Sequence, residues 1–353
     1  MMNIKKSILS CLLLMVCCLT QAHDFVVFLN GQNVYFSIKS KKDKTAVITY
    51  RGSIAASTPT DYRGELIVPA KVKHDSIVYS VVGIGTKAFS GAEKLTGIVL
   101  PMGITSIGDF AFEGCTSLSK IVFPGNEVKF GQGVFFKCGK IQFVSLGSDW
   151  RSIDLQMFRW SDSLSTLSIP AKMEKIRNMK SLKKLEGINV DANNERFASV
   201  DGVLYNKNKE ILYGCPRAYT GTLRVLEGTK KITSGAFVDC VGISRVDLPE
   251  SLENISFREF SRMKSLHEIV FRRGTLISTA MHKGTGVFLL QVANPEVQII
   301  VPKKSQKFYQ NALIKQEGEY TEVDGKIPFM IEADELPDVA NVKGVKDFNK
   351  YEQ

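Results

Sequence analysis

The stretch that decides the fold runs from residue 84 to residue 124 and contains nearly the same line of sequence twice. Residues 84–101 read IGTKAFSGAEKLTGIVLP, and residues 107–124 read IGDFAFEGCTSLSKIVFP. The two lines are offset by 23 residues, so that Phe89 corresponds to Phe112 and Leu95 corresponds to Leu118. A fixed period in the twenties is typical of a solenoid, in which each repeat forms one short coil stacked on its neighbours.

The 23-residue register extends beyond these two lines, is interrupted once and then returns. Steps of 23 residues from Phe112 reach Phe135 and Phe158, and the same step joins Phe237 to Phe260 after the break. Because the matched positions are apolar in successive repeats, we expect these phenylalanine side chains to stack inside the solenoid.

Each repeat also contains the pattern L-x-x-I-x-L, which marks the strand of a leucine-rich repeat. The last two apolar positions are two residues apart, so both side chains face the core and the residue between them faces outward. The preceding Ile-Gly-x-x-Ala-Phe segment is too short for a regular helix of its own. The sequence therefore predicts an α/β-type leucine-rich-repeat solenoid, with a parallel β-sheet on one wall and short helical or irregular segments on the other.

These repeats resemble the BspA-like leucine-rich-repeat family of bacterial surface and secreted proteins. The two lines quoted above carry the resemblance, together with ITSGAFVDCVGISRVDLP at residues 232–249. Residues 189–216 are similar to the longer, hairpin-bearing repeat that is common in that family. The resemblance covers roughly residues 60–275 and implies a parallel-stranded solenoid with a binding or adhesion role, but it names no ligand.

Residues 1–22 have the features of a secretory signal peptide. Two lysines precede an apolar run at residues 8–19, which is followed by Thr-Gln-Ala, and we expect cleavage before His23. The alternative is a lipoprotein acylated at Cys17 or Cys18, although Val16 and Cys17 stand where a lipobox requires a small residue. Both interpretations export the chain, either released or held at the cell surface or in the periplasm of a bacterium.

The segments outside the regular repeats predict two caps and one insert. Residues 23–82 contain runs of β-branched and aromatic residues and are expected to form a β-rich N-terminal cap that seals the first coil. The solenoid itself occupies residues 83–275, with a β-hairpin insert near residues 189–216. Residues 276–353 are expected to form a C-terminal cap and tail, with a last strand at 297–302 and a short helix at 306–312.

Four cysteines remain after removal of the predicted signal peptide: Cys115, Cys138, Cys215 and Cys240. Three of them share one repeat position, three residues after the core phenylalanine. Export permits disulfides, and Cys115 and Cys138 lie on adjacent coils, about one strand spacing apart. We favour buried free thiols, and a bridge remains the alternative. No C-x-x-C pair or histidine cluster indicates a metal, and no cofactor is expected.

Charge and motifs argue against nucleic-acid binding and catalysis. The formal net charge is +10, but the basic residues are dispersed, and the predicted export leads away from nucleic acid. His23, His74, His267 and His282 lie on unrelated segments, and the sequence contains no G-x-S-x-G, P-loop or H-E-x-x-H motif. We therefore expect a protein that is not an enzyme.

If the chain acts by binding, the outward positions of the strands are the expected contact surface, because a solenoid holds them on rigid strands. The candidate contact residues are Lys120, Phe143, Trp150, Trp160 and Arg245. Exposed aromatic side chains carry much of the binding energy at interfaces, but for both tryptophans we favour packing in the core, because they flank the core positions Ile153 and Phe158. The predicted function is binding of a protein or glycan at the cell surface. The alternative is a structural or assembly component of the cell envelope.

Overall fold

A computed structural model gives the structure of the protein and describes residues 23–51, 61–255, 259–260, 262–275, 297–303 and 329–333. The chain divides into two units, Met1–Ser148 (unit 1) and Asp149–Gln353 (unit 2), and each is described separately. The predicted signal peptide and the predicted helix at residues 306–312 lie outside the described residues. Within the described part of the chain, no helix is both long enough and apolar enough to cross a membrane.

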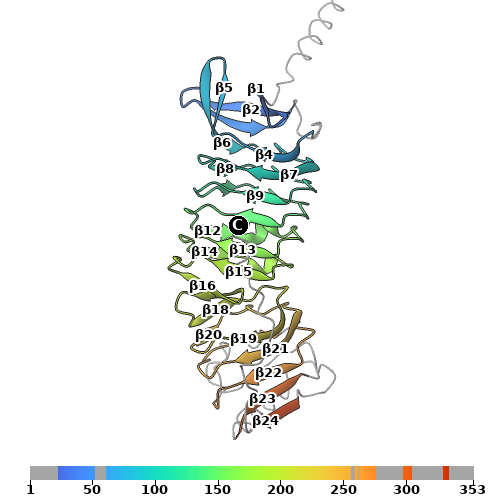
Figure 1. Ribbon diagram of the computed structural model, residues 1–353, viewed down its shortest axis with the longest axis vertical. Helices are drawn as coiled ribbons and strands as arrows, with labels where there is room; N and C mark the ends of the chain where they lie inside the picture. The colour runs from blue at the N-terminus through green and yellow to red at the C-terminus, as the bar shows by residue number, and fades with distance from the viewer. Residues whose placement is uncertain are drawn as a thin grey trace, which may run out of the picture. The chain divides into compact units, whose positions relative to one another are not determined.

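Two ladders of short parallel strands form the repeats of unit 1 (Figure 1). One is the four-stranded sheet of β4 (Arg63–Ile67), β7 (Lys94–Val99), β9 (Lys120–Val122) and β11 (Phe143–Ser145). The other contains β6 (Ile77–Ile84), β8 (Ser106–Ile107) and β10 (Lys129–Phe130). Each coil thus contributes one strand to each ladder, which makes the array a β-solenoid.

Antiparallel strands precede the first coil of unit 1. They are β1 (Phe25–Leu29), β2 (Gln32–Ser40) and β3 (Thr45–Thr49). A further antiparallel strand, β5 (Lys71–His74), follows β4 and pairs with β6. β1 pairs with β2 and β2 with β3, and β3 then pairs in parallel with β6. The last of these pairings joins the N-terminal strands to the ladder of the repeats, so the first coil is not left with an open edge on this side.

A column of phenylalanine rings fills the core of unit 1. Phe89 stacks on Phe112 with ring centroids 5.1 Å apart, and Phe112 stacks on Phe135 with centroids 5.4 Å apart. All three side chains are fully buried, as are Leu95 and Leu118 of the strands. Full burial of one such side chain stabilises the fold by roughly 1.5–3 kcal/mol, so the column is a main source of stability.

The sequence predicted an α/β-type solenoid with short helical or irregular segments on the second wall. In the described residues the α/β class and the helical form of this wall are wrong, because turns and two- or three-residue strands form it. The only helical segments described are the 3-10 turns η3 (Leu155–Phe158) and η4 (Met179–Ser181). The reason is that successive amide groups alternate between acceptors: Ser90 N donates to Lys87 O at 3.1 Å within its own turn, whereas Phe89 N donates to Ala111 O at 2.8 Å on the next coil. The positive φ of Gly91, 72°, further prevents a continuous helix.

Polar side chains of unit 1 also bond to the neighbouring coil at the period of the sequence. The hydroxyl of Ser119 donates to Thr96 O at 3.0 Å, and the hydroxyl of Thr105 donates to Val82 O at 3.1 Å. Both bonds join residues 23 positions apart. The polar surface of the coils therefore follows the same register as the apolar core.

Unit 2 contains parallel ladders of the same kind, together with the insert. Its regular strands are β12 (Ser152–Asp154) with β14 (Lys175–Arg177), β13 (Thr166–Ile169) with β15 (Gly187–Val190), and the five-stranded sheet β19 (Thr220–Arg224), β21 (Gly242–Leu248), β22 (Glu268–Phe271), β23 (Gln298–Pro302) and β24 (Phe329–Ala333). The insert is an antiparallel meander of β16 (Phe197–Val200), β17 (Val203–Asn206) and β18 (Ile211–Gly214). β18 then pairs in parallel with β20 (Lys231–Ile232), which returns the chain to the ladder. β24 comes from the segment that the sequence analysis assigned to the tail.

Candidate functional site

Two rows of outward side chains cross the sheet β4–β7–β9–β11 of unit 1. The first row is Glu65, Gly97, Lys120 and Phe143, and the second is Ile67, Val99, Val122 and Ser145. Adjacent members of a row lie on hydrogen-bonded strands, about 4.8 Å apart. These eight positions are called the unit 1 face below. The register places the predicted contact residues Lys120 and Phe143 next to each other on it.

Lys120 forms an ion pair that spans a strand. Its Nζ lies 2.8 Å from Oε1 of Glu65, although β7 runs between the strands that carry the two residues. The bridge is possible because Gly97 has no side chain there; a Cβ at that position would lie 3.2 Å from Cγ of Glu65. An ion pair at a surface contributes only about 0–1 kcal/mol, so its main effect is to fix the position of the ammonium group.

The remaining large side chains of the unit 1 face are apolar and accessible. Ile67 is 55% exposed and Phe143 is 47% exposed, while Val99 and Val122 between them are half-buried. Ile67, Val99 and Val122 are direct cross-strand neighbours, and Phe143 is diagonal to Val122. The face therefore presents a continuous apolar row beside one oriented ion pair.

The two tryptophans of unit 2 differ in accessibility. Trp150 is 1% exposed, which confirms the favoured core packing and removes this residue from the candidate contact residues. Its large apolar ring is more stabilising inside the coil, where burying an aromatic side chain removes about 150–250 Å² from water. Trp160 is 43% exposed, and the guanidinium of Arg159 lies 4.8 Å from the centre of its ring.

Arg245 belongs to a network of charges on the strands β21 and β22 of unit 2. Its Nη1 lies 2.5 Å from Oε1 of Glu268, and its Nη2 lies 3.9 Å from Oδ2 of Asp247. Arg272 binds the nearly buried Asp247 through Nε at 2.6 Å and Nη2 at 2.5 Å. Arg245 is thus already engaged with acidic partners and shares no site with Trp150 or Trp160.

The described histidines lie on separate segments, and the described cysteines are buried. The His74 ring stacks on Phe25 with centroids 4.4 Å apart, and His267 Nδ1 lies 3.3 Å from Ser265 O. All four cysteines are free and buried, and the Cys138 thiol donates to Phe112 O at 2.9 Å. Across the part of the chain that the structure describes, no group of three or more His, Cys, Asp or Glu side chains is placed to hold a metal ion. His282 lies outside the described residues.

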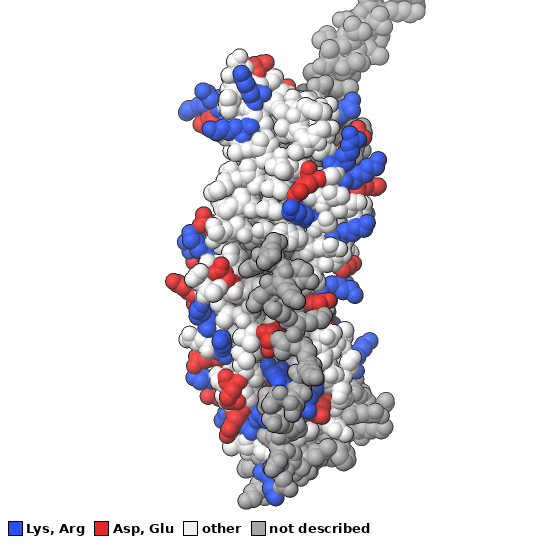
Figure 2. Space-filling model, in the orientation of Figure 1, with Lys and Arg blue, Asp and Glu red and all other residues white. Residues whose placement is uncertain are grey.

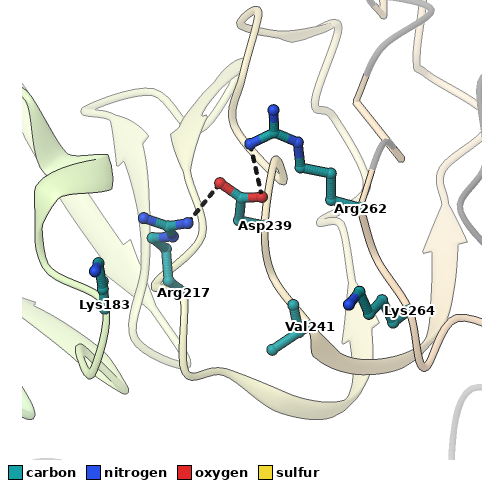
Figure 3. A pocket seen from close by; sticks show the side chains of 6 residues that line it. All are labelled: Lys183, Arg217, Asp239, Val241, Arg262 and Lys264. Atoms are coloured by element: carbon teal, nitrogen blue, oxygen red, sulfur yellow. Dashed lines mark hydrogen bonds and ion pairs between the residues drawn. The ribbon is translucent and has the colours of Figure 1, made fainter.

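Unit 2 contains a pocket that was not predicted from the sequence (Figure 3). It has a volume of about 390 Å³ and is lined by Lys183, Arg217, Asp239, Val241, Arg262 and Lys264. Asp239 and Arg262 are 23 residues apart, as are Val241 and Lys264, so the register alone places each pair on adjacent coils. Lys183 and Arg217 could not be placed in this way, because they flank the insert that interrupts the register.

Charges of both signs are interspersed on the face of the molecule that Figure 2 shows, in agreement with the dispersed basic residues of the sequence. The net charge of +10 therefore does not produce one large basic field over the described residues of that face. Local groups of charges, such as those of the pocket, matter more than the total.

A comparison with protein families agrees with the repeats of the fold. The BspA type leucine rich repeat region matches in six copies, over residues 72–199 and 209–312. A search of curated proteins gives no match. One similar solved structure is the pneumococcal vaccine antigen PcpA, at 17% identity over 88% of this chain and 99% of that chain, with a TM-score of 0.43. A second is a leucine rich cell surface protein from Faecalibacterium prausnitzii, at 18% identity over 82% of this chain and 93% of that chain, with a TM-score of 0.42. A third is a leucine-rich repeat protein from Bacteroides ovatus, at 17% identity over 88% of this chain and 100% of that chain, with a TM-score of 0.40. The family match covers well over half of the sequence and agrees with the repeats seen in both units, so the chain belongs to the BspA-type leucine-rich-repeat family.

Proposed function

We propose that this chain is an exported binding protein of a bacterial cell surface, which holds a protein partner non-covalently on the unit 1 face. The observation that carries the proposal is the accessible apolar row of Ile67, Val99 and Val122 next to Phe143. Membership of the BspA-type family supports a role at the bacterial surface. The features of a signal peptide in residues 1–22 support export.

The energetics of the unit 1 face favour contact with a protein. Contiguous exposed apolar side chains leave water at a gain of about 25 cal/mol per Å² when a complementary surface covers them. The strands that carry them are already ordered by the ladder, so binding costs little conformational entropy. Phe143 can act as an anchor, and the fixed Lys120–Glu65 pair supplies a charged contact beside it.

A protein partner fits this face better than a glycan. Recognition of a neutral glycan requires many hydrogen-bonding groups, and the row Ile67–Val99–Val122 offers only hydrocarbon. A protein surface supplies apolar side chains of matching size. The proposed activity involves no covalent step and no cofactor.

Binding of the exported chain to purified extracellular-matrix proteins, with a glycan array in parallel, tests the proposal. The test variant is Ile67→Asn with Phe143→Ala, which removes the apolar anchors from the unit 1 face. The matched control is Val26→Asn with Phe28→Ala, because both side chains are exposed on β1 of the same unit. We expect binding to a matrix protein to weaken by at least about tenfold in the first variant, since anchor residues cost about 2 kcal/mol or more, and to stay unchanged in the second.

If both variants bind the matrix protein with equal affinity, the contact surface does not lie on the unit 1 face. Binding to glycans alone would show that the partner class is wrong. Thermal denaturation of both variants separates a loss of binding from a loss of folding, because the four substituted side chains are exposed and should leave the Tm nearly unchanged.

A further inference from the structure

The pocket of unit 2 carries more positive than negative charge. Four of its six lining residues are cationic, and Asp239 is the single carboxylate, so the lining has an excess of three positive charges. Figure 3 shows Asp239 between Arg217 and Arg262, with Lys183 on the side of Arg217 and Lys264 on the side of Arg262. Cations grouped in a concavity raise the local concentration of anions.

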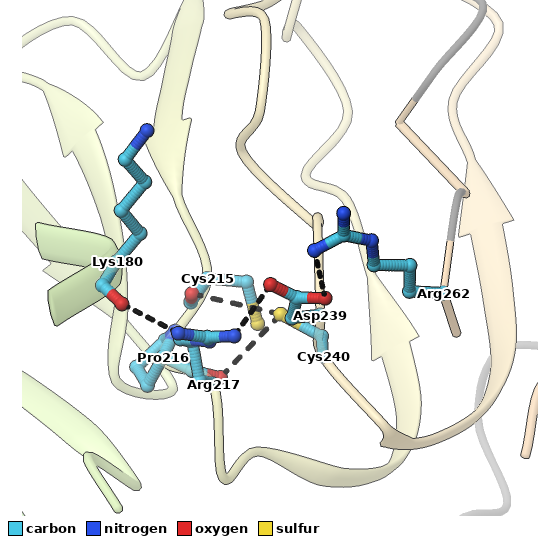
Figure 4. A network of polar contacts seen from close by, with 7 residues as sticks. All are labelled: Lys180, Cys215, Pro216, Arg217, Asp239, Cys240 and Arg262. Carbon is cyan, nitrogen blue, oxygen red and sulfur yellow. Dashed lines mark hydrogen bonds and ion pairs between the residues drawn. The ribbon is translucent and has the colours of Figure 1, made fainter. Parts of the chain in front are cut away.

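Arg217 is held rigidly at one side of this pocket (Figure 4). Its Nη1 donates to Lys180 O at 2.6 Å, and its Nη2 lies 2.5 Å from Oδ2 of Asp239. Only about a fifth of the Arg217 and Asp239 side chains is exposed. These contacts occupy two of the five N–H donors of the guanidinium and leave the others available in a fixed orientation.

The other cations are less restrained. Arg262 contacts Asp239 only at 3.4 Å, and its side chain is 72% exposed. Neither Lys183 nor Lys264 forms an ion pair with any residue that the structure describes. An incoming anion therefore meets three adaptable cations and one oriented guanidinium, whose remaining N–H donors are available beside its pair with Asp239.

The main chain around the pocket has little to offer a ligand. Val241 N donates to Asp239 O at 2.9 Å, Ala218 N donates to Leu185 O at 2.8 Å, and the Cys240 thiol is turned toward the carbonyl oxygens of Cys215 and Pro216 at 3.7 Å (Figure 4). An extended peptide is usually held by main-chain pairing with a free strand edge. Recognition in this pocket must instead depend on side-chain charge.

We propose that this pocket binds an acidic saccharide, a sugar ring that carries a carboxylate or sulfate group. The anionic group pairs with Arg217 and with the lysine on its side of the pocket, Lys183 or Lys264, and the C–H face of the ring packs on the exposed side chain of Val241. A volume of about 390 Å³ is larger than a bare inorganic anion requires and lies within the range of about 300–1,000 Å³ typical of small-molecule sites. Asp239 still has lone pairs that can accept a hydrogen bond from a sugar hydroxyl.

This site goes beyond the proposed function, since it lies in unit 2 and takes a different class of ligand from the unit 1 face. The two proposals can fail separately. The variant Ile67→Asn with Phe143→Ala should bind acidic saccharides as well as the wild type does, and a variant of the pocket should keep its affinity for a matrix protein.

Isothermal titration of the exported chain with defined probes tests the pocket. The probes are a heparin-derived oligosaccharide for sulfate, an oligomer of galacturonic acid for carboxylate, an oligomer of galactose as the neutral control, a poly-glutamate peptide and inorganic sulfate. The test variant is Lys183→Glu with Lys264→Glu. The matched control is Lys175→Glu with Lys231→Glu, which changes the charge of unit 2 equally at two exposed lysines outside the pocket.

We expect one or both acidic oligosaccharides to bind, the galactose oligomer not to bind, and added salt to weaken the affinity. The pocket variant should lose at least about tenfold in affinity, and the control variant should lose far less. Comparison of the two acidic probes decides between sulfate and carboxylate.

If the pocket and control variants lose affinity for the acidic oligosaccharides equally, binding depends only on net charge and the proposal is overturned. Binding of the neutral oligomer, absence of binding to both acidic oligosaccharides, or binding of poly-glutamate or inorganic sulfate as tight as that of the sugars would also overturn it. Because the four substituted lysines make no ion pair in the described residues, circular dichroism should show unchanged folding in both variants.

Discussion

Replacing Phe112 with alanine tests whether the aromatic column holds the coils of unit 1 together. The ring is fully buried and stacks on Phe89 on one side and Phe135 on the other, at 5.1 and 5.4 Å. Truncation of a buried phenylalanine costs about 3–5 kcal/mol, and an aromatic pair adds about 0.5–1.5 kcal/mol beyond its buried area. Because two pairs are lost at once, we expect the free energy of unfolding to fall by about 5 kcal/mol, the upper end of that range.

Urea denaturation followed by circular dichroism measures this loss, and Phe143→Ala provides the control. That substitution makes the same chemical change in the same unit at a side chain that is 47% exposed, so it should cost no more than about 1 kcal/mol. Arrays of coils do not always unfold in one step, so amide hydrogen exchange of the coils around residue 112 should be measured as well. Equal losses in Phe112→Ala and Phe143→Ala would refute the reasoning, because the stacked ring would then contribute no more than a surface ring.

Three further outcomes test other parts of the structure. Gly147→Ala should lower the stability of unit 1 by roughly 1–3 kcal/mol, because the added Cβ would collide with the carbonyl oxygen of Pro124. The control Gly125→Ala should leave the Tm nearly unchanged, because its Cβ would meet only side-chain atoms at 3.5 Å or beyond. The thiols of Cys115 and Cys215 should react with Ellman's reagent only after unfolding: a hydrogen bond with Cys138 and burial raise the pKa of Cys115, and burial raises the pKa of Cys215. Fast reaction of the folded chain would contradict this burial. Finally, burial raises the pKa of Tyr219 to about 12, against about 10 in the unfolded chain, so the stability that this phenol contributes is complete below pH ~10 and is lost as the pH rises toward 12. Tyr219→Phe should make the urea midpoint less dependent on pH in that window, and an unchanged dependence would show that Tyr219 is not the group responsible.

The buried positions could be predicted from the repeat, because a constant period places chemically equivalent residues on equivalent points of each coil. Phe89, Phe112 and Phe135 are the clearest case. The conformation of the second wall could not be predicted in the same way. It depends on whether an amide such as Phe89 N finds its acceptor inside its own segment or on the next coil, at Ala111 O, and both choices bury the same apolar side chains.

At the candidate sites too, only the contacts that follow the repeat register could be predicted from the sequence. Lys120 and Phe143 are neighbours because the register makes them so, but Glu65 precedes the regular repeats, and its bridge to Lys120 depends on the space above Gly97. Trp150 has no aromatic partner one period away in the sequence, so its place in the core was inferred only from its nearness to the core position Ile153. Arg217 follows the insert, and only the folded chain brings it beside Asp239.

The contacts between coils in unit 1 have a kinetic consequence. The bonds from Ser119 Oγ to Thr96 O and from Thr105 Oγ1 to Val82 O each join residues 23 positions apart. Each coil that follows β7 therefore closes a loop of the same size, at an entropic cost of about 3 kcal/mol from the logarithmic term, and does so against a neighbour that already presents its acceptors. Folding can nucleate in one coil and spread to the next, at a rate set by a single closure and not by the length of the array. In evolution, a duplication or deletion of one whole coil would preserve every such bond elsewhere, whereas the loss of a few residues within a coil would misalign that coil with its two neighbours.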